Sequence, residues 1–260
     1  MYEFHSDRDH YFQMQKSVCE DYIIPFIEKV YSVNHDAKIL EVGCGTAGVL
    51  SAFLDMGHIG FGVDLESCSL DYAHEKLAGY VESKQLTLIN DDIYSVDFEK
   101  DYNVKFDIII LKDVIEHIYN QEKLLQRLKS FLLPSGVIFI GFPPWQMPFG
   151  GHQQVCRSKF LMHLPYFHLL PMPVYKFILK SFKEDPVHFC ELKKTGISID
   201  RFEKLAKKTE FTIVNKVFYF INPIYKYKFN MKTRKQAAII GSIPYFRNFL
   251  TTSAFYLIKA

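Results

Sequence analysis

Apolar runs alternate with amphipathic segments along the first half of the chain. The pattern predicts strands near residues 38–43, 59–64, 86–90, 106–111 and 136–142. It predicts helices between them near residues 46–56, 67–79 and 120–131. Such alternation is typical of an α/β fold, in which helices cover both faces of a mostly parallel sheet.

The same periodicities extend the fold in both directions. Apolar positions at helical spacing over residues 10–33 predict an amphipathic helix before the first strand. Near the end, a helix over residues 199–208 and strands over residues 211–221 and 253–258 would complete the sheet. Asp200 and Glu203 are spaced to cap that last helix.

Two segments do not fit this alternation. Residues 143–197 follow the fifth strand and are apolar, aromatic, broken by prolines and edged with cations. Because loops at the carboxyl ends of parallel strands bind ligands, we expect a helical lid over the acceptor; the alternative is a hairpin that thickens the core or forms a dimer face. Residues 222–250 form a second, basic and aromatic insertion.

One domain, residues 1–260, accounts for the whole pattern. Its predicted parts are an N-terminal helical cover (1–37), a cofactor-binding core (38–142), the lid insertion (143–197) and a C-terminal completion of the sheet (198–260).

A glycine turn follows the first predicted strand. Gly43 and Gly45 leave room for a ligand beside the backbone, the next helix offers free N–H groups, and Asp64 closes the second strand where a carboxylate can bind a ribose diol. Gly43, Gly45 and Gly48 also match the spacing of dinucleotide sites. Glu41 favours another nucleoside, because a carboxylate there would repel a pyrophosphate but attract a cationic amino-acid group.

These segments resemble the class I S-adenosylmethionine-dependent methyltransferases, a Rossmann-like fold whose seven-stranded sheet ends in an antiparallel strand. The similarity covers five ordered segments within residues 38–142: the glycine turn, the acid-tipped second and third strands, the fourth strand through Asp113–His117, and the fifth strand with its preceding turn. Ala47 and Ser135 stand where the family usually has glycine, and both are small. The resemblance implies S-adenosylmethionine as cofactor, bound by Glu41, Gly43, Cys44, Gly45, Asp64, Leu65, Asp92, Ile93 and Lys112.

Methyl transfer needs mainly alignment, and an alcohol or phenol acceptor also benefits from a base. His152, after a glycine pair, and His117, which matches an acid-histidine pair of the family, are the candidate catalytic residues. Glu116, His117 and His152 have no close-spaced metal motif, so no metal is predicted. Methyltransferases that act on amino groups carry a Pro-Pro-aromatic motif after the fourth strand. Here Pro143 and Pro144 follow the fifth strand, which argues against amino-group methylation. Trp145 is expected either to line the acceptor pocket or to anchor the lid.

Composition bears on the cellular location and on charged partners. Five scattered cysteines without a Cys-x-x-Cys pair and an N-terminus without an apolar signal core favour the cytoplasm, and no stretch of 18 apolar residues predicts a membrane span. Residues 1–142 hold 12 Lys and Arg against 23 Asp and Glu, whereas residues 143–260 hold 19 against 6. The basic half either meets an anionic partner or pairs with the acidic half.

Three functions remain in view. The leading one is a methyltransferase that acts on a small-molecule or lipid-linked acceptor. Oxygen is the expected methylated atom, and the enzyme could contact a membrane peripherally. The alternatives are an NAD-dependent oxidoreductase on the same glycine turn and a non-enzymatic adaptor for nucleic acid or membranes. We do not expect a nucleic-acid partner, because the positive charge is scattered through predicted elements, and the oligomeric state is not predicted.

Overall fold

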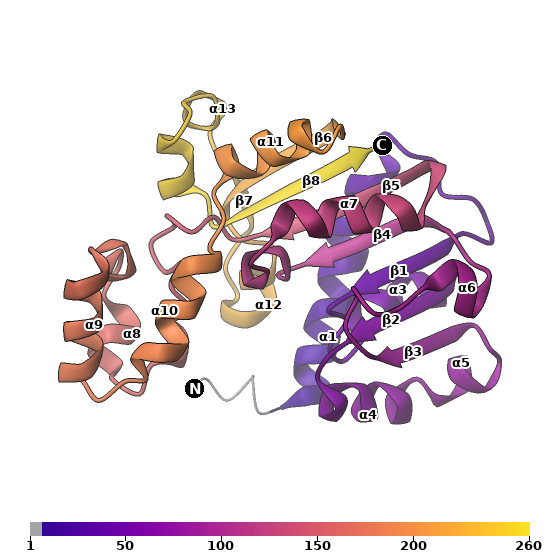
Figure 1. Ribbon diagram of the computed structural model, residues 1–260, viewed down its shortest axis with the longest axis horizontal. Coiled ribbons are helices and arrows are strands. Elements are labelled where there is room, and N and C mark those ends of the chain that lie inside the picture. The colour runs from indigo at the N-terminus through magenta and orange to yellow at the C-terminus, as the bar shows by residue number, and fades with distance from the viewer. Residues whose placement is uncertain (1–6) are drawn as a thin grey trace.

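The computed structural model describes residues 7–260; residues 1–6, where the predicted N-terminal cover begins, lie outside the described residues. Its centre is one eight-stranded sheet in the order β3-β2-β1-β4-β5-β8-β6-β7 (Figure 1). The strands are β1 (Lys38–Val42), β2 (Ile59–Asp64), β3 (Leu86–Asn90), β4 (Phe106–Lys112), β5 (Leu132–Phe142), β6 (Thr212–Ile221), β7 (Arg234–Lys235) and β8 (Ser253–Lys259).

The first five strands are parallel, and β8 is antiparallel to both β5 and β6. The predicted fold class is therefore confirmed, with eight strands instead of seven. The additional strand is β7, two residues from the second insertion that pair with the edge strand β6. The strand order reverses between β1 and β4, where open α/β sheets place their ligands.

Helices cover both faces of the sheet. One face packs against α6 (Phe98–Tyr102), α7 (Gln121–Phe131) and α11 (Ile199–Lys208). The other packs against α1 (Arg8–Val18), α2 (Ile24–Glu28), α3 (Gly48–Asp55) and α4 (Ser67–Lys76), with the short α5 (Ala78–Glu82) following α4. None of the helices within residues 7–260 is long and apolar enough to cross a bilayer.

The N-terminal helix differs from the continuous helix predicted over residues 10–33. Between α1 and α2 the chain forms one π-helical turn, Cys19–Ile23, and the helical structure ends at Glu28. Pro25 occupies the first turn of α2, and because proline has no N–H, the helical hydrogen-bond ladder is rearranged just before it.

The insertion over residues 143–197 is helical, as predicted. It contains two 3-10 turns, η4 (Gln153–Val155) and η5 (Phe167–Leu169), and the helices α8 (Lys159–His163), α9 (Met172–Ser181) and α10 (Pro186–Thr195). These three helices stand together beside the sheet at the left of Figure 1. They have a small core of their own, which includes Leu161, Tyr175 and Phe189.

The second insertion holds α12 (Ile224–Phe229), β7, α13 (Ala238–Gly241) and the 3-10 turn η6 (Phe246–Leu250). Its Arg247 is buried and binds Asp200 at 2.8 Å and Glu203 at 2.7 Å. The predicted capping role of these two acids is therefore wrong: Ser198 caps α11 by accepting from the N–H of Arg201, and the acids instead neutralise an arginine that lies 44 or more residues away.

Candidate active site

The glycine turn connects β1 to α3 at the carboxyl edge of the sheet. Gly43 donates its backbone N–H to the carbonyl of Val63 at 2.8 Å, and Gly45 donates to Oδ2 of Asp64 at 2.7 Å. Gly43 and Gly45 have φ angles of +69° and +50°, which only glycine adopts without strain. A Cβ on Gly43 would also lie 2.5 Å from Cγ2 of Val114. The turn is thus closed by its own hydrogen bonds, with bare backbone beside the ligand edge.

Asp64 stands at the tip of β2, where the sequence places the ribose-binding carboxylate. Its Oδ1 accepts from the N–H of Glu66 at 2.8 Å, while Asn90, at the tip of β3, donates its side-chain amide to the carbonyl of Asp64 at 2.9 Å. These contacts fix the carboxylate, whose remaining lone pairs can accept two hydroxyl groups. Leu65, next in the chain, is 73% exposed.

Glu41 lies under the turn and is buried. Its Oε2 accepts the N–H of Leu50, in the first turn of α3, at 3.1 Å. Burial raises the pKa of Glu41 to about 8, although the Leu50 N–H and the Lys112 ammonium both favour the charged form. A cationic ligand group beside Glu41 would restore its ordinary ionisation, so this acid suits an ammonium or sulfonium and not a phosphate.

The predicted adenine contacts follow β3. Asp92 accepts the N–H of Tyr94 at 2.9 Å, and Ile93 is buried in the core. Cys44 is also buried, with its sulfur against Gly62 of β2. Cys44 can therefore contact a cofactor only through its backbone. Asp92 keeps lone pairs that can accept a further hydrogen bond, and Ile93 offers only the small exposed part of its side chain.

Lys112 ends β4 and pairs with Asp113 at 2.7 Å. Burial disfavours its charge, but Asp113 and then Tyr11 raise the pKa of Lys112 overall. Burial raises the pKa of Tyr11, and it lowers that of Lys228, in α12, to about 8, with Lys112 contributing to the second shift. The sequence pointed to a helical cover and a basic insertion, but it did not identify Tyr11 and Lys228 as neighbours of this edge.

α1 closes the site from the N-terminal side. A Cβ on Gly48 would lie 2.6 Å from the carbonyl oxygen of Phe12 and 2.8 Å from Cβ of Gln15. Gly48 therefore lets α1 pack directly on the first turn of α3. The predicted helical cover does lie over the cofactor end of the sheet.

A second group of polar side chains lies after β4 and β5. Glu116 and His117 belong to the 3-10 turn η3 (Ile115–His117), and His152 precedes η4. Donor atoms of the three residues lie within 4.8 Å of one another, and the two imidazole rings meet edge to face with centroids 4.9 Å apart. The structure thus brings together the two predicted catalytic histidines, which are 35 residues apart in the chain.

Burial sets the ionisation of this group. It lowers the pKa of His117, and burial followed by the neighbouring His117 lowers that of His152 to about 4. Burial and Asp113 raise the pKa of Glu116 well above its usual range. Both imidazoles are therefore neutral near pH 7, and His152 is a hydrogen-bond acceptor or ligand rather than a strong base.

Close packing positions His152. A Cβ on Gly150 would lie 2.3 Å from the carbonyl oxygen of Trp145, and a Cβ on Gly151 would lie 2.4 Å from Cβ of His168. His168 in turn bonds the Trp145 carbonyl at 2.7 Å through Nε2. Trp145 lines a small hollow with Glu116 and His152, and its ring packs against Gly196.

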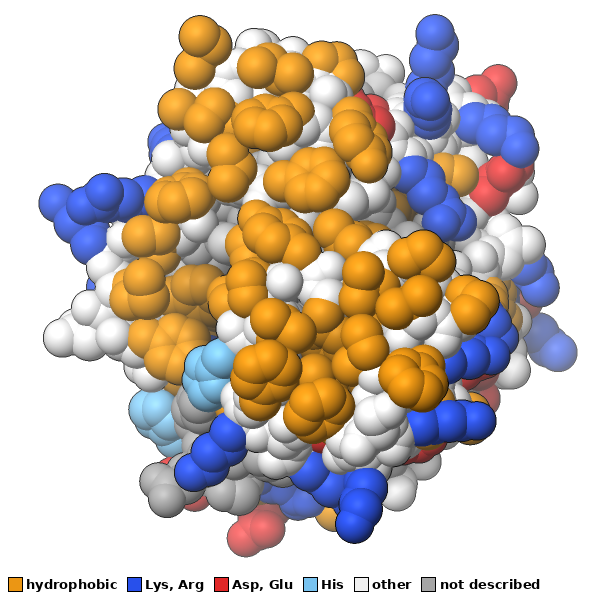
Figure 2. Space-filling view, turned by 90° about the vertical axis from the view of Figure 1, so that its left-hand side faces the viewer, with side chains coloured by type: hydrophobic (Ala, Val, Ile, Leu, Met, Phe, Trp, Pro, Cys, Tyr) orange, Lys and Arg blue, Asp and Glu red, His pale blue; other side chains and the backbone are white. Residues whose placement is uncertain are grey.

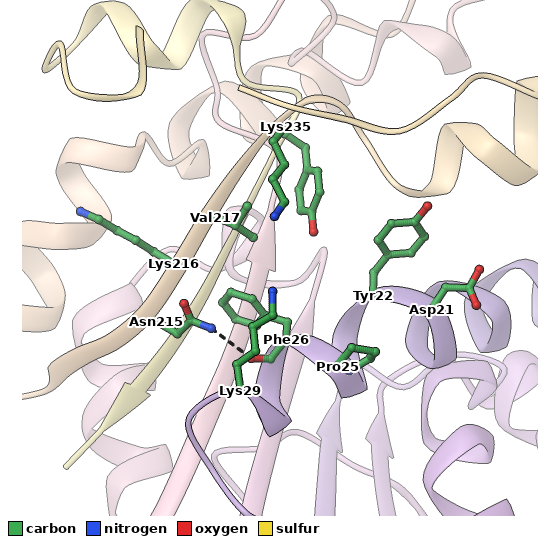
Figure 3. A pocket seen from close by; sticks show the side chains of 10 residues that line it. Asp21, Tyr22, Pro25, Phe26, Lys29, Asn215, Lys216, Val217 and Lys235 are labelled. Carbon is green, nitrogen blue, oxygen red and sulfur yellow. Dashed lines mark hydrogen bonds between the residues drawn. The ribbon is translucent and has the colours of Figure 1, made fainter. Parts of the chain in front are cut away.

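A separate hollow of about 360 Å³ lies between α2 and β6 and includes none of the predicted cofactor or catalytic residues. Lys29 and Lys235 extend toward the same space, whereas Lys216 turns away from it (Figure 3). Lys216 binds Glu203 at 2.8 Å. The carboxyl edge of β1, β2, β3 and β4, with the glycine turn, Asp64, Asp92 and Lys112, is called the nucleoside edge. We assign this edge, and not the separate hollow, as the candidate active site.

Comparison with known proteins agrees with this geometry. Residues 40–138 match the family model of the methyltransferase domain. A ubiquinone biosynthesis O-methyltransferase of Glaesserella parasuis is 33% identical over 108 residues, which are 40% of this chain and 44% of the relative. A carboxy-S-adenosyl-L-methionine synthase of Trichodesmium erythraeum is 27% identical over 133 residues, 47% of this chain and 51% of the relative. The chain thus spans about half the length of these curated relatives.

Solved structures share the fold over nearly the whole chain. An S-adenosylmethionine-dependent methyltransferase from Clostridium acetobutylicum aligns with a TM-score of 0.58 and 14% identity, covering 94% of this chain and 91% of that one. The geranyl diphosphate C-methyltransferase of Streptomyces coelicolor aligns with a TM-score of 0.58 and 11% identity, covering 94% and 79%.

Fold, glycine turn and matched segment agree: residues 40–138 match the methyltransferase domain family, and the chain shares the fold of S-adenosylmethionine-dependent methyltransferases. The matched residues begin in β1 and end in β5, so they include the glycine turn and the acids after β2 and β3.

Proposed function

We propose that this protein transfers a methyl group from S-adenosylmethionine to an oxygen atom of a small-molecule or lipid-linked acceptor. The observation that carries the proposal is the buried Glu41 beneath a glycine turn whose opening is flanked by Asp64. The names of the similar O-methyltransferases support oxygen as the methylated atom.

Each residue of the nucleoside edge binds a different part of the cofactor. Asp64 accepts the ribose hydroxyls, Asp92 accepts the adenine amino group with Leu65 and Ile93 against the ring, and Glu41 attracts the amino-acid end. The backbone of Gly43, Cys44 and Gly45 borders the ligand, and Lys112 and Asp113 complete the edge below β4. η3 and the loop before η4 follow β4 and β5 at the same edge of the sheet, so we place the acceptor beside them.

S-adenosylmethionine would supply an electrophilic methyl group to the acceptor oxygen and would leave as S-adenosylhomocysteine, while the acceptor's proton would pass to solvent. His117 and His152 contact that acceptor. As neutral imidazoles they accept the hydrogen bond of its hydroxyl and so turn an oxygen lone pair toward the methyl group. Trp145 borders the same hollow and contacts an apolar or aromatic part of the acceptor.

Calorimetry with S-adenosylhomocysteine tests cofactor binding. We expect one saturable site in the wild-type protein and a large loss of affinity in Asp64→Ala. Saturable binding of NAD with none of S-adenosylhomocysteine would instead favour the oxidoreductase, which the position of Glu41 argues against. Transfer of labelled methyl groups into a cellular lipid extract or a polar metabolite extract would then identify the acceptor class.

Surface character supports a membrane-borne acceptor. Side chains of the helical insertion and of the α13 segment form an apolar face whose members are 44–74% exposed: Phe160, Val174, Phe177, Val187, Ile239, Ile243, Tyr245 and Phe246. Figure 2 shows many apolar side chains gathered on one side of the molecule, with Lys and Arg side chains around them. Lys176, Lys180 and Lys183 are exposed along α9 and just after it. An apolar face with a cationic edge suits an anionic bilayer.

Vesicle sedimentation tests this contact. The wild-type protein should sediment with phosphatidylcholine vesicles that contain phosphatidylglycerol, and less with pure phosphatidylcholine. Phe177→Asp combined with Ile239→Asp should abolish sedimentation, while Val30→Asp, which changes an exposed apolar residue after α2, should not. Equal sedimentation of both variants would exclude the apolar face as the membrane contact.

A further inference from the structure

Glu116 has an unusual environment for a carboxylate. It is 6% exposed, and neither carboxylate oxygen has a hydrogen-bond partner among the described residues. Burying a polar group without a partner costs about 1–3 kcal/mol, and more when the group is charged. A native site that keeps such a side chain therefore needs a partner for it.

The groups nearest to Glu116 are metal-ligating ones. His117 and His152 each place a ring nitrogen in the same cluster, in which the donor atoms lie within 4.8 Å of one another. The residues come from two separate turns, η3 after β4 and the turn before η4 after β5, so the cluster is a product of the fold and not of helix spacing. Two imidazoles and one carboxylate match the ligand sets that bind zinc, iron(II) and manganese in proteins.

We propose that Glu116, His117 and His152 bind one divalent transition-metal ion beside the small hollow that Trp145 lines. Three protein ligands leave coordination positions for an oxygen of the acceptor, and Trp145 and Gly196 border the space where it would lie. The role toward the acceptor rests on the proposed function, whereas the binding of the ion does not. With the ion bound, the two histidines would act on the acceptor through the metal, in place of the direct hydrogen bonds assigned to them in the metal-free protein.

The turn that carries two of the ligands is held in place. Gln121 donates its side-chain amide to the carbonyl of Ile115 at 3.0 Å and to the carbonyl of Thr195, at the end of α10, at 2.7 Å. η3 is therefore tied to the helical insertion. On the other side, the close packing of Gly150 and Gly151 against Trp145 and His168 seats His152. A preorganised shell of this kind is what a metal site requires.

Cobalt(II) is a direct probe of the ligands. The full chain is freed of metal with a chelator, dialysed and titrated with cobalt(II), while visible absorption and calorimetry are recorded. We expect one ion per chain and visible bands of a cobalt site with nitrogen ligands. Glu116→Gln and His152→Ala should each weaken binding by about 10- to 100-fold or more, as loss of ligand-shell groups does. Zinc should displace the cobalt and remove the bands.

His163→Ala is the matched control. His163 is an exposed histidine of α8 that bonds the carbonyl of Lys159, and its removal should leave the cobalt spectrum unchanged. Binding of S-adenosylhomocysteine reports the folding of every variant and separates this proposal from the proposed function. If folded Glu116→Gln and His152→Ala bind cobalt as the wild type does, or if the wild type gives no such bands, the metal site is excluded even though the methyltransferase assignment stands.

Discussion

Gly45 donates its backbone N–H to Oδ2 of Asp64 at 2.7 Å, so the acid assigned to the ribose also holds the glycine turn closed. A single side chain thereby links the shape of the glycine turn to its affinity for the ligand. The two tasks are compatible because a carboxylate has about four lone-pair positions, and the hydrogen bonds from Gly45 and Glu66 use only two of them.

Asp64→Ala should therefore weaken both the turn and the cofactor site. Hydrogen bonds to a charged group contribute about 1.5–3 kcal/mol each, so we expect S-adenosylhomocysteine to bind about 100-fold more weakly or worse. The melting temperature of the ligand-free protein should fall as well. Asp71→Ala, which changes an exposed acid of α4, should alter neither quantity. A variant of Asp64 that keeps wild-type affinity would remove the ribose assignment.

Cofactor affinity should depend on pH through Glu41. Its pKa is about 8 in the ligand-free protein, so below that pH binding of a cationic group must expel a proton from Glu41. Affinity should then rise by up to about tenfold per pH unit toward pH 8 and level off above it. Calorimetry in buffers of different ionisation enthalpy would detect the released proton. Glu41→Gln should bind more weakly and lose the slope.

Glu41 also makes the stability of the ligand-free protein depend on pH. Its folded pKa lies above its unfolded value of about 4.3, so the folded state keeps a proton that the unfolded state releases between these values. Its contribution is full below the unfolded pKa and is lost as the pH rises through about 8. Thermal melts should show a flatter decline over this range in Glu41→Gln than in the wild type. Identical pH profiles for the two proteins would contradict the raised pKa.

Ala47 has a φ of +58°, the left-handed conformation that explains why related chains usually carry glycine there. A non-glycine residue pays about 1–2 kcal/mol for it, and glycine loses up to about 1 kcal/mol more backbone entropy on folding. Ala47→Gly should therefore stabilise the protein slightly, by roughly 0–1 kcal/mol in denaturant titrations. Gly48→Ala, one residue later, should destabilise it strongly because of the Phe12 carbonyl. Marked destabilisation by Ala47→Gly would contradict this account of the turn.

Arg247 should be a stability determinant far from the site. It is 7% exposed and binds Asp200 and Glu203, so Arg247→Met removes the buried cation that both carboxylates share, although Lys216 still pairs with Glu203. Breaking a buried pair costs about 3–5 kcal/mol, and the partial exposure of the acids places the expected loss near the lower end. Lys226→Met removes the exposed pair with Asp21 and should lower stability much less, because solvent screens an exposed ion pair. Equal losses in urea titrations would show that burial does not distinguish the two pairs.

Opposite charges of the two halves do meet in the folded protein. Lys226 and Lys208, from the basic half, pair with Asp21 and Glu122 of the acidic half. Other cations of the basic half edge the apolar face, where no acid of the first half is paired with them among the described residues. Pairing between the two halves is therefore confirmed for Lys208 and Lys226, whereas an anionic partner for the remaining cations stays a prediction.

The sequence by itself determined the parallel core, the glycine turn and the acids at the tips of its strands. Each of these depends on local periodicity or on positions fixed by strand length, because parallel strands bring their carboxyl ends to one edge whatever the packing elsewhere. Glu41 could be recognised for the same reason, since it lies two residues before the turn. Even the break at Pro25 has a local cause, although periodicity alone did not locate it.

Only the tertiary structure decided which distant loops touch. It brought Glu116 and His117 to His152, paired Arg247 with the acids of α11, and placed Tyr11 and Lys228 beside Lys112. These contacts join segments separated by insertions whose path depends on side-chain packing, on close approaches at glycines and on the burial of single polar groups. Sequence spacing does not predict these contacts, because the packing and burial that stabilise them arise only when the whole chain has folded.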